Sequence, residues 1–186
     1  AVGENQFRSK VEGAFLKIEF VDNYFLVTDK KGTKYTFGKQ ATSQLTDPEN
    51  TSKVFKWFLD RIEDIHGNYL TIAYDKSNGD DEISVLPNNI VYTGNPQASP
   101  FMKVQFSFIQ RTDPILTFQG GFRTMTRNIL QKISVLQTSG LSSANLLREY
   151  NFKYHSSELT GRSLLERIVV NDGQGKAFPE LKLSYS

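Results

Sequence analysis

Residues that often carry chemistry are scattered along this chain without a recognised catalytic motif. The chain has only two histidines, His66 inside a predicted turn and His155 beyond a predicted strand. A catalytic base needs specific partners, and the sequence holds no Gly-x-Ser-x-Gly elbow that could supply a nucleophile. We therefore interpret both histidines as surface residues. The sequence predicts that this chain is not an enzyme and has no catalytic residue.

Carboxylates provide the next candidates for chemistry. Pairs such as Asp60 with Asp64, or Glu158 with Glu166, would suit a glycoside hydrolase, but any chain with 20 acidic residues contains such pairs. Oxygen ligands also gather between Asn78 and Glu82, without the spacing of an EF-hand loop. With no cysteine and no histidine pair, a zinc site is excluded as well. We predict no bound metal and no cofactor.

Aromatic side chains could form a surface that stacks on sugars. Trp57, Tyr69, Tyr74 and Tyr92 are the candidates, although aromatics that alternate along strands more often form the core face of a sheet. This alternative is a carbohydrate- or surface-binding β module, with Trp57 and Tyr69 as its contacts. It requires exposed aromatics along one groove.

The composition favours strands as the elements that position these residues. The 186 residues include 14 Phe and 8 Tyr but only 2 Met, a balance that suits pleated, partly buried surfaces. With 22 basic and 20 acidic side chains, the net charge of +2 is too even for a nucleic-acid-binding protein. No apolar stretch approaches the length of a membrane span. We expect neither nucleic acid nor a membrane span.

Three hairpins share one turn pattern. The spacing Asp-x-x-Gly occurs from Asp29 to Gly32, from Asp64 to Gly67 and from Asp172 to Gly175. Asp can bond the backbone two residues further on, and Gly accepts the positive φ that a tight reversal requires. Each pattern lies between an apolar run and a strand that contains Tyr, which indicates weak internal repetition.

The clearest strand follows the second of these turns. Leu70, Ile72 and Tyr74 alternate with Thr71 and Ala73, so we expect the first three on one buried side. The chain also ends on an alternating strand, Leu181 to Tyr185. Such an unclosed edge predicts pairing with further β structure.

Further strands and breaks complete the predicted order. Strands are expected over 85–93, 102–109, 129–135 and 150–154, with breaks at Gly94-Asn95-Pro96, Asp113-Pro114 and Gly120-Gly121. Residues 53–63 fit a helical face as well as a strand, and residues 142–149 do so more weakly. Both assignments stay open from the sequence.

One stretch, from Trp57 to Asp75, resembles a tyrosine-aspartate (YD) repeat of RHS proteins. It contains Ile62-Glu63-Asp64, then Gly67-Asn68, then Tyr74-Asp75 in the order of that repeat. Further segments follow in the order of the SpvB-type N-terminal region of insecticidal Tc-toxin B components: Asn89–Tyr92, Phe106–Asp113, Leu130–Val135, Leu147–Tyr154, Ser163–Ile168 and Leu183–Tyr185. The resemblance covers roughly residues 25–186.

This resemblance implies a structural function. In such proteins the region belongs to a β shell beside a β-propeller, the shell encloses a toxic polypeptide, and enzyme activity lies in other segments. The chain departs from the family pattern because it has one complete tyrosine-aspartate unit and neither a propeller repeat nor an RHS core protease motif. It would therefore be a fragment of a longer protein or a reduced relative.

The sequence as a whole predicts an all-β, mainly antiparallel fold. Successive hairpins would form a twisted sheet or open shell with at most one or two short helices, as a single module over residues 1–186. Its function would be a non-catalytic structural module of a Tc/RHS-type toxin or virulence-related protein, secreted or at the bacterial surface. The expected partners are other β segments of the same parent polypeptide or toxin complex, or a glycan in the alternative. The positions expected to define its turns and repeat are Asp29, Gly32, Asp64, Gly67, Asn68, Tyr74, Asp75, Asp172 and Gly175.

Overall fold

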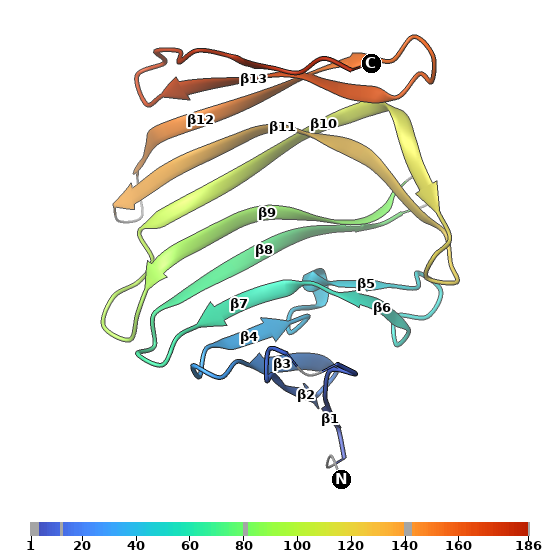
Figure 1. Cartoon of the computed structure of the whole chain (residues 1–186), viewed down its shortest axis with the longest axis vertical. Helices are drawn as coiled ribbons and strands as arrows, with labels where there is room; N and C mark the ends of the chain where they lie inside the picture. Colours follow the sequence, from blue (N-terminus) through green and yellow to red (C-terminus); the bar gives the residue numbers. More distant parts are fainter. Residues whose placement is uncertain (1–3, 12, 80–81, 140–142, 186) are drawn as a thin grey trace. The chain divides into compact units, whose positions relative to one another are not determined.

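Antiparallel strands make up nearly all of the regular structure (Figure 1). The computed structural model describes residues 4–11, 13–79, 82–139 and 143–185. One short 3-10 helix, η1 (Ala41–Ser43), accompanies the strands. Within the described residues, no helix is long and apolar enough to cross a membrane. The predicted all-β, antiparallel fold is confirmed.

The chain divides into two compact units. Unit 1 comprises Ala1–Asn78 and Val85–Pro100, and unit 2 comprises Gly79–Ser84 and Phe101–Ser186. That the two act as a single module stays a prediction.

Unit 1 contains one sheet and a separate small hairpin. The strands of the sheet lie in the order β1-β2-β3-β4-β7-β8-β9. Their bounds are β1 (Gln6–Phe7), β2 (Lys17–Val21), β3 (Tyr24–Thr28), β4 (Lys34–Phe37), β7 (Leu59–Glu63), β8 (Tyr69–Asn78) and β9 (Ile83–Gly94), whose first two residues belong to unit 2. The hairpin pairs β5 (Gln44–Thr46) with β6 (Val54–Trp57).

Unit 2 is built from longer strands. They are β10 (Met102–Thr117), β11 (Thr124–Ser139), β12 (Ser143–Ser156), β13 (Ser163–Asp172) and β14 (Leu181–Lys182), paired in chain order. The start of β9 belongs to this unit, and its Ile83 pairs with Met125 of β11.

The Asp-x-x-Gly segments form turns with one common geometry. In the first, the Asp29 carboxylate accepts hydrogen bonds from the N–H groups of Lys31 at 2.8 Å and Thr33 at 3.0 Å. The Asp64 carboxylate accepts from the N–H groups of His66 and Asn68 in the same way, and the Asp172 carboxylate from those of Gln174 and Lys176. The glycines have positive φ, +85° at Gly32, +79° at Gly67 and +86° at Gly175. Each turn is fixed by local bonds, so a short sequence pattern is enough to indicate it.

The segment 53–63 is extended from Val54 onward, although its apolar spacing also suits a helix. β6 ends at Trp57 and β7 begins at Leu59, and only Phe58 interrupts the extended chain. The Phe58 N–H donates to the Ser43 carbonyl, and the Phe58 carbonyl accepts from the Gly38 N–H. Pairing with the preceding strands therefore decides the conformation. In the second ambiguous segment, residues 143–149 belong to β12, and residue 142 lies outside the described residues.

Two predicted boundaries are wrong. Asp113-Pro114 does not break the chain, because β10 continues through it with a bulge in which the four residues from Arg111 to Pro114 lie opposite Arg127 alone. A proline lacks the N–H that a ladder needs, and a bulge is where a strand tolerates it.

The last strand is the other difference. β14 includes only Leu181 and Lys182 instead of extending to Tyr185. Beyond it, the Leu183 N–H still bonds the Glu166 carbonyl, and the Tyr185 hydroxyl bonds the Leu165 carbonyl. β13 bulges at Glu166, which disturbs the ladder just where β14 ends.

The sheet of unit 1 has one apolar face and one mostly polar face. The registers place Leu70 beside Ile62 and Thr71 beside Arg61, so Ile72 and Tyr74 share the side of Leu70, as predicted. None of the three is fully buried, contrary to the expectation of a buried side. The apolar face of unit 1 consists of Ile18, Phe20, Phe25, Val27, Tyr35, Phe37, Ile62, Leu70, Ile72 and Tyr74.

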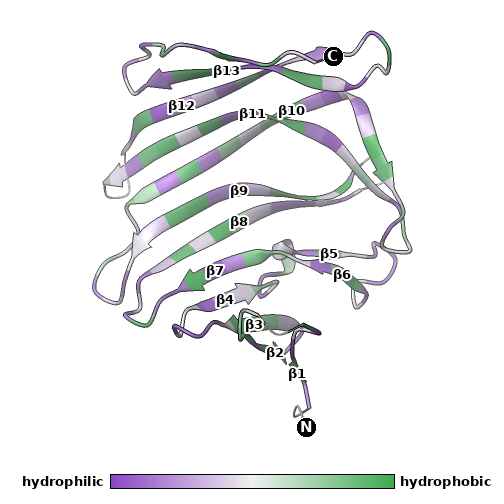
Figure 2. Cartoon of the chain, viewed as in Figure 1, coloured by the Kyte–Doolittle hydropathy of each residue, from purple (hydrophilic) through white to green (hydrophobic). Residues whose placement is uncertain are grey.

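The strands of unit 2 also have one apolar face and one mostly polar face. Its cross-strand pairs place Phe106 beside Ile133, Ile133 beside Tyr150, and Phe152 beside Ile168. The opposite face carries mainly polar side chains, and Figure 2 shows the resulting alternation along β10 to β13. The apolar face of unit 2 consists of Val104, Phe106, Phe108, Leu130, Ile133, Val135, Tyr150, Phe152, Ile168 and Val170.

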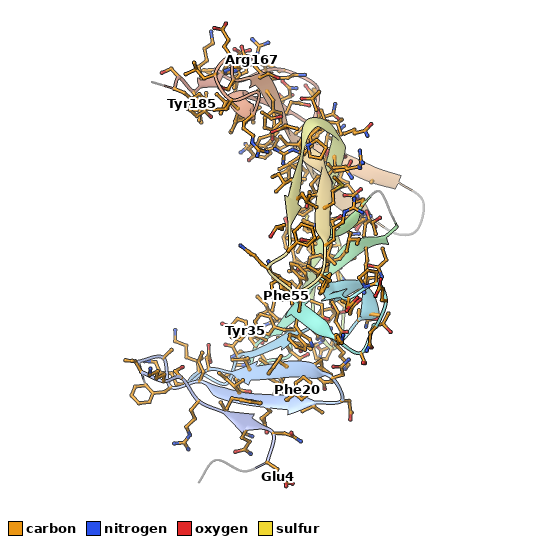
Figure 3. All side chains as sticks on the ribbon, turned by 90° about the vertical axis from the view of Figure 1, so that its right-hand side faces the viewer. Glu4, Phe20, Tyr35, Phe55, Arg167 and Tyr185 are labelled. Atoms are coloured by element: carbon orange, nitrogen blue, oxygen red, sulfur yellow. The ribbon has the colours of Figure 1, made fainter. Side chains whose placement is uncertain are left out.

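The two units have almost no conventional core. Leu45, Ile83 and Val85 are the only hydrophobic residues classed as buried among those described. In Figure 3 the side chains of each unit project from both faces of its strands. The chain exposes 12158 Å², whereas a compact protein of 21.1 kDa would expose about 9,000 Å² and two separate compact halves about 11,000 Å². Much apolar surface therefore stays in contact with solvent.

Candidate functional site

The apolar faces are the largest candidate site for contact with another polypeptide. Every residue that forms them is partly exposed. Monomeric proteins seldom leave contiguous apolar patches larger than a few hundred Å² open to water, and larger patches usually mark an interaction surface. At one end of the face of unit 1, Trp57 packs edge-on against Phe20 and Phe25 with ring centroids 6.1 and 5.1 Å away.

Beside this face, a buried carboxylate of unit 1 accepts three hydrogen bonds. Asp60 is 5% exposed and lies at a bulge of β7. Its Oδ2 accepts hydrogen bonds from the N–H groups of Lys39 at 2.7 Å and Gln40 at 3.1 Å. The Ser43 hydroxyl, which is fully buried, donates to the same oxygen at 2.8 Å. Asp60 thus fixes the connection between β4 and η1 on the sheet.

Two neighbours from β8 extend this polar cluster. The Tyr74 hydroxyl donates to the Leu59 carbonyl at 2.7 Å, and burial together with the nearby negative charge of Asp60 raises the pKa of Tyr74. The Lys76 ammonium donates to the Thr46 hydroxyl at 2.8 Å, and burial lowers its pKa. The first bond joins β8 to β7, and the second connects the β5–β6 hairpin with the sheet.

A second carboxylate has a comparable position in unit 2. Asp113 lies in the bulge of β10 and forms a two-pronged ion pair with Arg111, with both contacts at 3.1 Å. It also accepts from the backbone N–H of Ser163 at 2.9 Å and from the Ser163 hydroxyl. The bonds from Arg111 and Ser163 hold the pKa of Asp113 far below its usual range. Asp113 joins β10 to the start of β13.

The residues considered for catalysis each have a separate local environment. His66 is exposed in its turn in unit 1, and His155 is exposed in unit 2, where its ring lies 6.3 Å from that of Tyr185. Asp60 serves the cluster just described, whereas Asp64 serves its own turn, where the bond from Asn68 lowers its pKa. Glu158 and Glu166 are exposed side chains of unit 2.

The oxygen cluster near residue 80 is only partly described. Asp80 and Asp81 lie outside the described residues. Glu82 accepts bonds from the Asn128 amide at 2.7 and 2.9 Å and from the Ser84 hydroxyl at 2.8 Å. In the described part of the chain, no group of three or more metal-ligating side chains is found.

Trp57 and Tyr69 have different surroundings. The Trp57 indole N–H donates to the Asn23 carbonyl at 2.9 Å. The Tyr69 ring lies 4.0 Å from the Arg61 guanidinium, and it approaches Gly94 so closely that a Cβ there would be 2.4 Å from the ring. Each ring is thus already in contact with its own neighbours.

The predicted repeat positions next to Tyr69 are also engaged locally. Tyr74 belongs to the Asp60 cluster, and both oxygens of Asp75 accept from the Asn88 amide at 2.8 and 3.0 Å. Asn68 closes the Asp64 turn through its side chain. Their assignment to a tyrosine-aspartate repeat stays a prediction.

The serine residues that donate hydrogen bonds to Asp60 and Asp113 were not identified from the sequence. Ser43 has no signal of its own, and Ser163 lies 50 residues from Asp113. The spacing Arg111-x-Asp113 could have indicated an ion pair, because alternate residues of a strand share a face. Arg61 and Glu63 show the same spacing and form a bond of 2.7 Å.

Comparison with known proteins adds a family and a fold. The model of the family described as Salmonella virulence plasmid 65kDa B protein (SpvB) matches residues 4–99, more than half of the chain. The mono(ADP-ribosyl)transferase SpvB of Salmonella typhimurium is 25% identical over 81 residues, which cover 40% of this chain. This chain spans only 14% of the length of that relative.

Two solved structures share the fold. The N-terminal domain of effector protein SpvB from Salmonella typhimurium strain LT2 has a TM-score of 0.79 at 15% identity, covering 90% of this chain and 68% of that one. The Photorhabdus luminescens Tc holotoxin pore has a TM-score of 0.81 at 15% identity, covering 97% of this chain and 11% of that one.

Proposed function

The chain belongs to the SpvB family, and from this premise we propose that it is a non-catalytic structural module of a Tc/RHS-type toxin or virulence-related protein. Its role is to form wall and contact surface within a larger polypeptide or complex. The observation that carries the proposal is the uncovered apolar face of each unit. Burying such faces releases about 25 cal/mol for each Å² of apolar surface removed from water.

The size of the exposed surface supports a permanent partner. The area in excess of that of compact proteins is on the order of 1,000 to 3,000 Å², which overlaps the range of obligate interfaces. The faces carry few charges, so a partner of the same character, other β segments of the parent polypeptide, fits them. Matches to parts of much longer proteins support this view.

The absence of catalysis is part of the proposal. The matched SpvB structure is an N-terminal domain, and the matched relative is named for its mono(ADP-ribosyl)transferase activity. We expect this chain to transfer no label from radioactive NAD to proteins of a cell lysate. The names of the matched proteins, an effector and a holotoxin, support a secreted or surface location.

Adjacent residues of β12 allow a direct test of the contact function. Phe152 belongs to the apolar face of unit 2, and Lys153 points to the opposite face. With the remainder of the parent polypeptide expressed as a second chain, Phe152→Glu should abolish co-purification, whereas Lys153→Glu should not. Circular dichroism would check that both variants stay folded. Equal binding by the two variants would contradict the proposal.

The carbohydrate-binding alternative stays a prediction. It requires the rings of Trp57 and Tyr69 to face a ligand, and contacts within the chain already occupy part of both rings. A glycan array with Trp57→Ala and Tyr69→Ala variants would decide it.

A further inference from the structure

A pocket of about 590 Å³ opens beside the Asp60 cluster in unit 1. Its lining comes from three places. They are the segment from β4 into η1 (Lys39, Gln40, Thr42), β7 (Asp60, Arg61) and β8 (Thr71, Ile72, Ala73). Its volume is within the range of small-molecule sites, about 300 to 1,000 Å³. Nothing in the proposed wall function requires this pocket.

One oxygen of Asp60 accepts no hydrogen bond from the described residues. All three hydrogen bonds to the carboxylate end on Oδ2. Among the described residues, none donates to Oδ1, although Asp60 is 5% exposed and lines the pocket. Oδ1 is not among the buried side-chain atoms that lack a partner in the described part of the chain, so it is accessible from the pocket. An acceptor is therefore held rigidly at the wall of the pocket.

The charges around Asp60 favour a neutral ligand. The Lys39 side chain is also at the pocket, with its ammonium 5.7 Å from the centre of the Tyr24 ring. The Arg61 guanidinium is engaged by Glu63 and stacks on Tyr69. A cationic ligand would meet both positive groups, and an anionic ligand would meet the carboxylate.

Hydroxyl groups complete the lining. Thr42 and Thr71 each contribute a hydroxyl-bearing side chain to it. The methyl group of Ala73 provides an apolar surface next to Thr71. We propose that this pocket binds a neutral, hydroxyl-rich small molecule such as a single sugar unit, whose hydroxyls donate to Asp60 Oδ1 and exchange hydrogen bonds with Thr42 and Thr71.

The location of the pocket is compatible with a covered apolar face. Arg61 and Thr71 are directly paired across β7 and β8 and lie on the polar side of the sheet. A ligand can therefore reach the pocket while another polypeptide covers the opposite side. This site differs from the one that the aromatic residues predict, because neither Trp57 nor Tyr69 lines it.

Nuclear magnetic resonance titration of the whole chain tests this proposal. The probes are D-glucose, D-galactose and N-acetyl-D-glucosamine, with ethylammonium chloride and sodium phosphate as charged probes. The amide signals of Lys39 and Gln40 report on Asp60 because both groups donate to it. We expect saturable shifts of these signals with at least one sugar, with a Kd on the order of 1 mM.

Substitutions assign the binding to the pocket. Thr71→Val removes one hydroxyl without a change of shape and should weaken sugar binding about tenfold, as expected for a buried hydrogen bond of about 1.4 kcal/mol. Asp60→Asn exchanges a charged acceptor for a neutral amide and should weaken it as well. Thr28→Val, on the same polar face but outside the pocket, is the matched control and should bind as the parent does.

Three results would overturn the proposal. The first is the absence of saturable shifts with every sugar while the chain is folded. The second is saturation by ethylammonium or phosphate alone, which would identify a charged ligand. The third is sugar binding that is unchanged in Thr71→Val and Asp60→Asn, which would place the site elsewhere.

Discussion

Asp60 and Asp113 solve a similar structural problem in different ways. Asp60 in unit 1 and Asp113 in unit 2 both lie at strand bulges and both accept bonds from a backbone amide and a serine hydroxyl. Asp113 uses both oxygens and has Arg111 as a counter-ion. Asp60 uses one oxygen, and no ion pair to it is found among the described residues. A bulge can thus be closed by charge pairing or by uncharged donors, and the second solution leaves an oxygen for a ligand.

Removing the Asp60 carboxylate should have the largest effect. In Asp60→Ala, the N–H groups of Lys39 and Gln40 and the Ser43 hydroxyl lose their common acceptor. A buried group without a partner costs about 1–3 kcal/mol, so we expect a loss of about 3 kcal/mol in the free energy of unfolding. Urea denaturation measures it. Asp60→Asn keeps one acceptor oxygen and should lose clearly less; equal losses would show that the three bonds contribute little.

Asp113→Asn should destabilise unit 2 less, and in a pH-dependent manner. The pKa of Asp113 is lowered in the folded protein from the ordinary value of 3.8, so its ionised form stabilises the fold. This contribution is fully present above pH 3.8 and is lost as the pH falls through the lower, folded-state pKa. Denaturation of the parent chain and the variant at a series of pH values should give curves that converge at low pH.

The control for this pH dependence comes from unit 1. The difference between the parent chain and Tyr74→Phe should stay constant over the same acidic range, because a tyrosine does not titrate there. Curves for Asp113→Asn that run parallel to that of the parent chain would contradict the ion-pair role of Asp113.

Ile72→Ala should cost about 1.5 kcal/mol, less than the 2–5 kcal/mol of a fully buried site. Ile72 lies on the open apolar face of unit 1 and is partly exposed. Ile133→Ala should behave alike, because Ile133 lies on the corresponding face of unit 2. Thermal unfolding of both variants tests this. A loss above about 3 kcal/mol in either would indicate that its face is already covered.

Tyr74→Phe is expected to show the smallest change, about 1 kcal/mol, because only the bond from its hydroxyl to the Leu59 carbonyl is lost. The ring keeps its place beside Phe58, with centroids 5.5 Å apart. Urea denaturation measures this difference. A loss as large as that of Asp60→Ala would place Tyr74 among the groups that close the bulge.

The sequence predicts features that depend on near neighbours. The turns at Asp29, Asp64 and Asp172 are made by bonds within four residues, and the alternation from Leu70 to Tyr74 shows which side chains share a face. The Asp60 and Asp113 clusters depend on residues 17 to 21 and 50 positions away, brought together by registers that bulges have shifted. Alternation also cannot tell an open face from a covered one, which is why Ile72 was expected to be buried.

Carbene footprinting tests most directly whether the apolar faces are contact surfaces. The chain would be labelled alone and within its full-length parent protein, and modification would be compared at Ile72 and Phe152 on the apolar faces and at Thr71 and Lys153 on the polar faces. We expect strong labelling of Ile72 and Phe152 in the chain alone and at least about fivefold protection in the parent protein, with Thr71 and Lys153 unchanged. Equal labelling of Ile72 and Phe152 in both samples would contradict the proposed wall function.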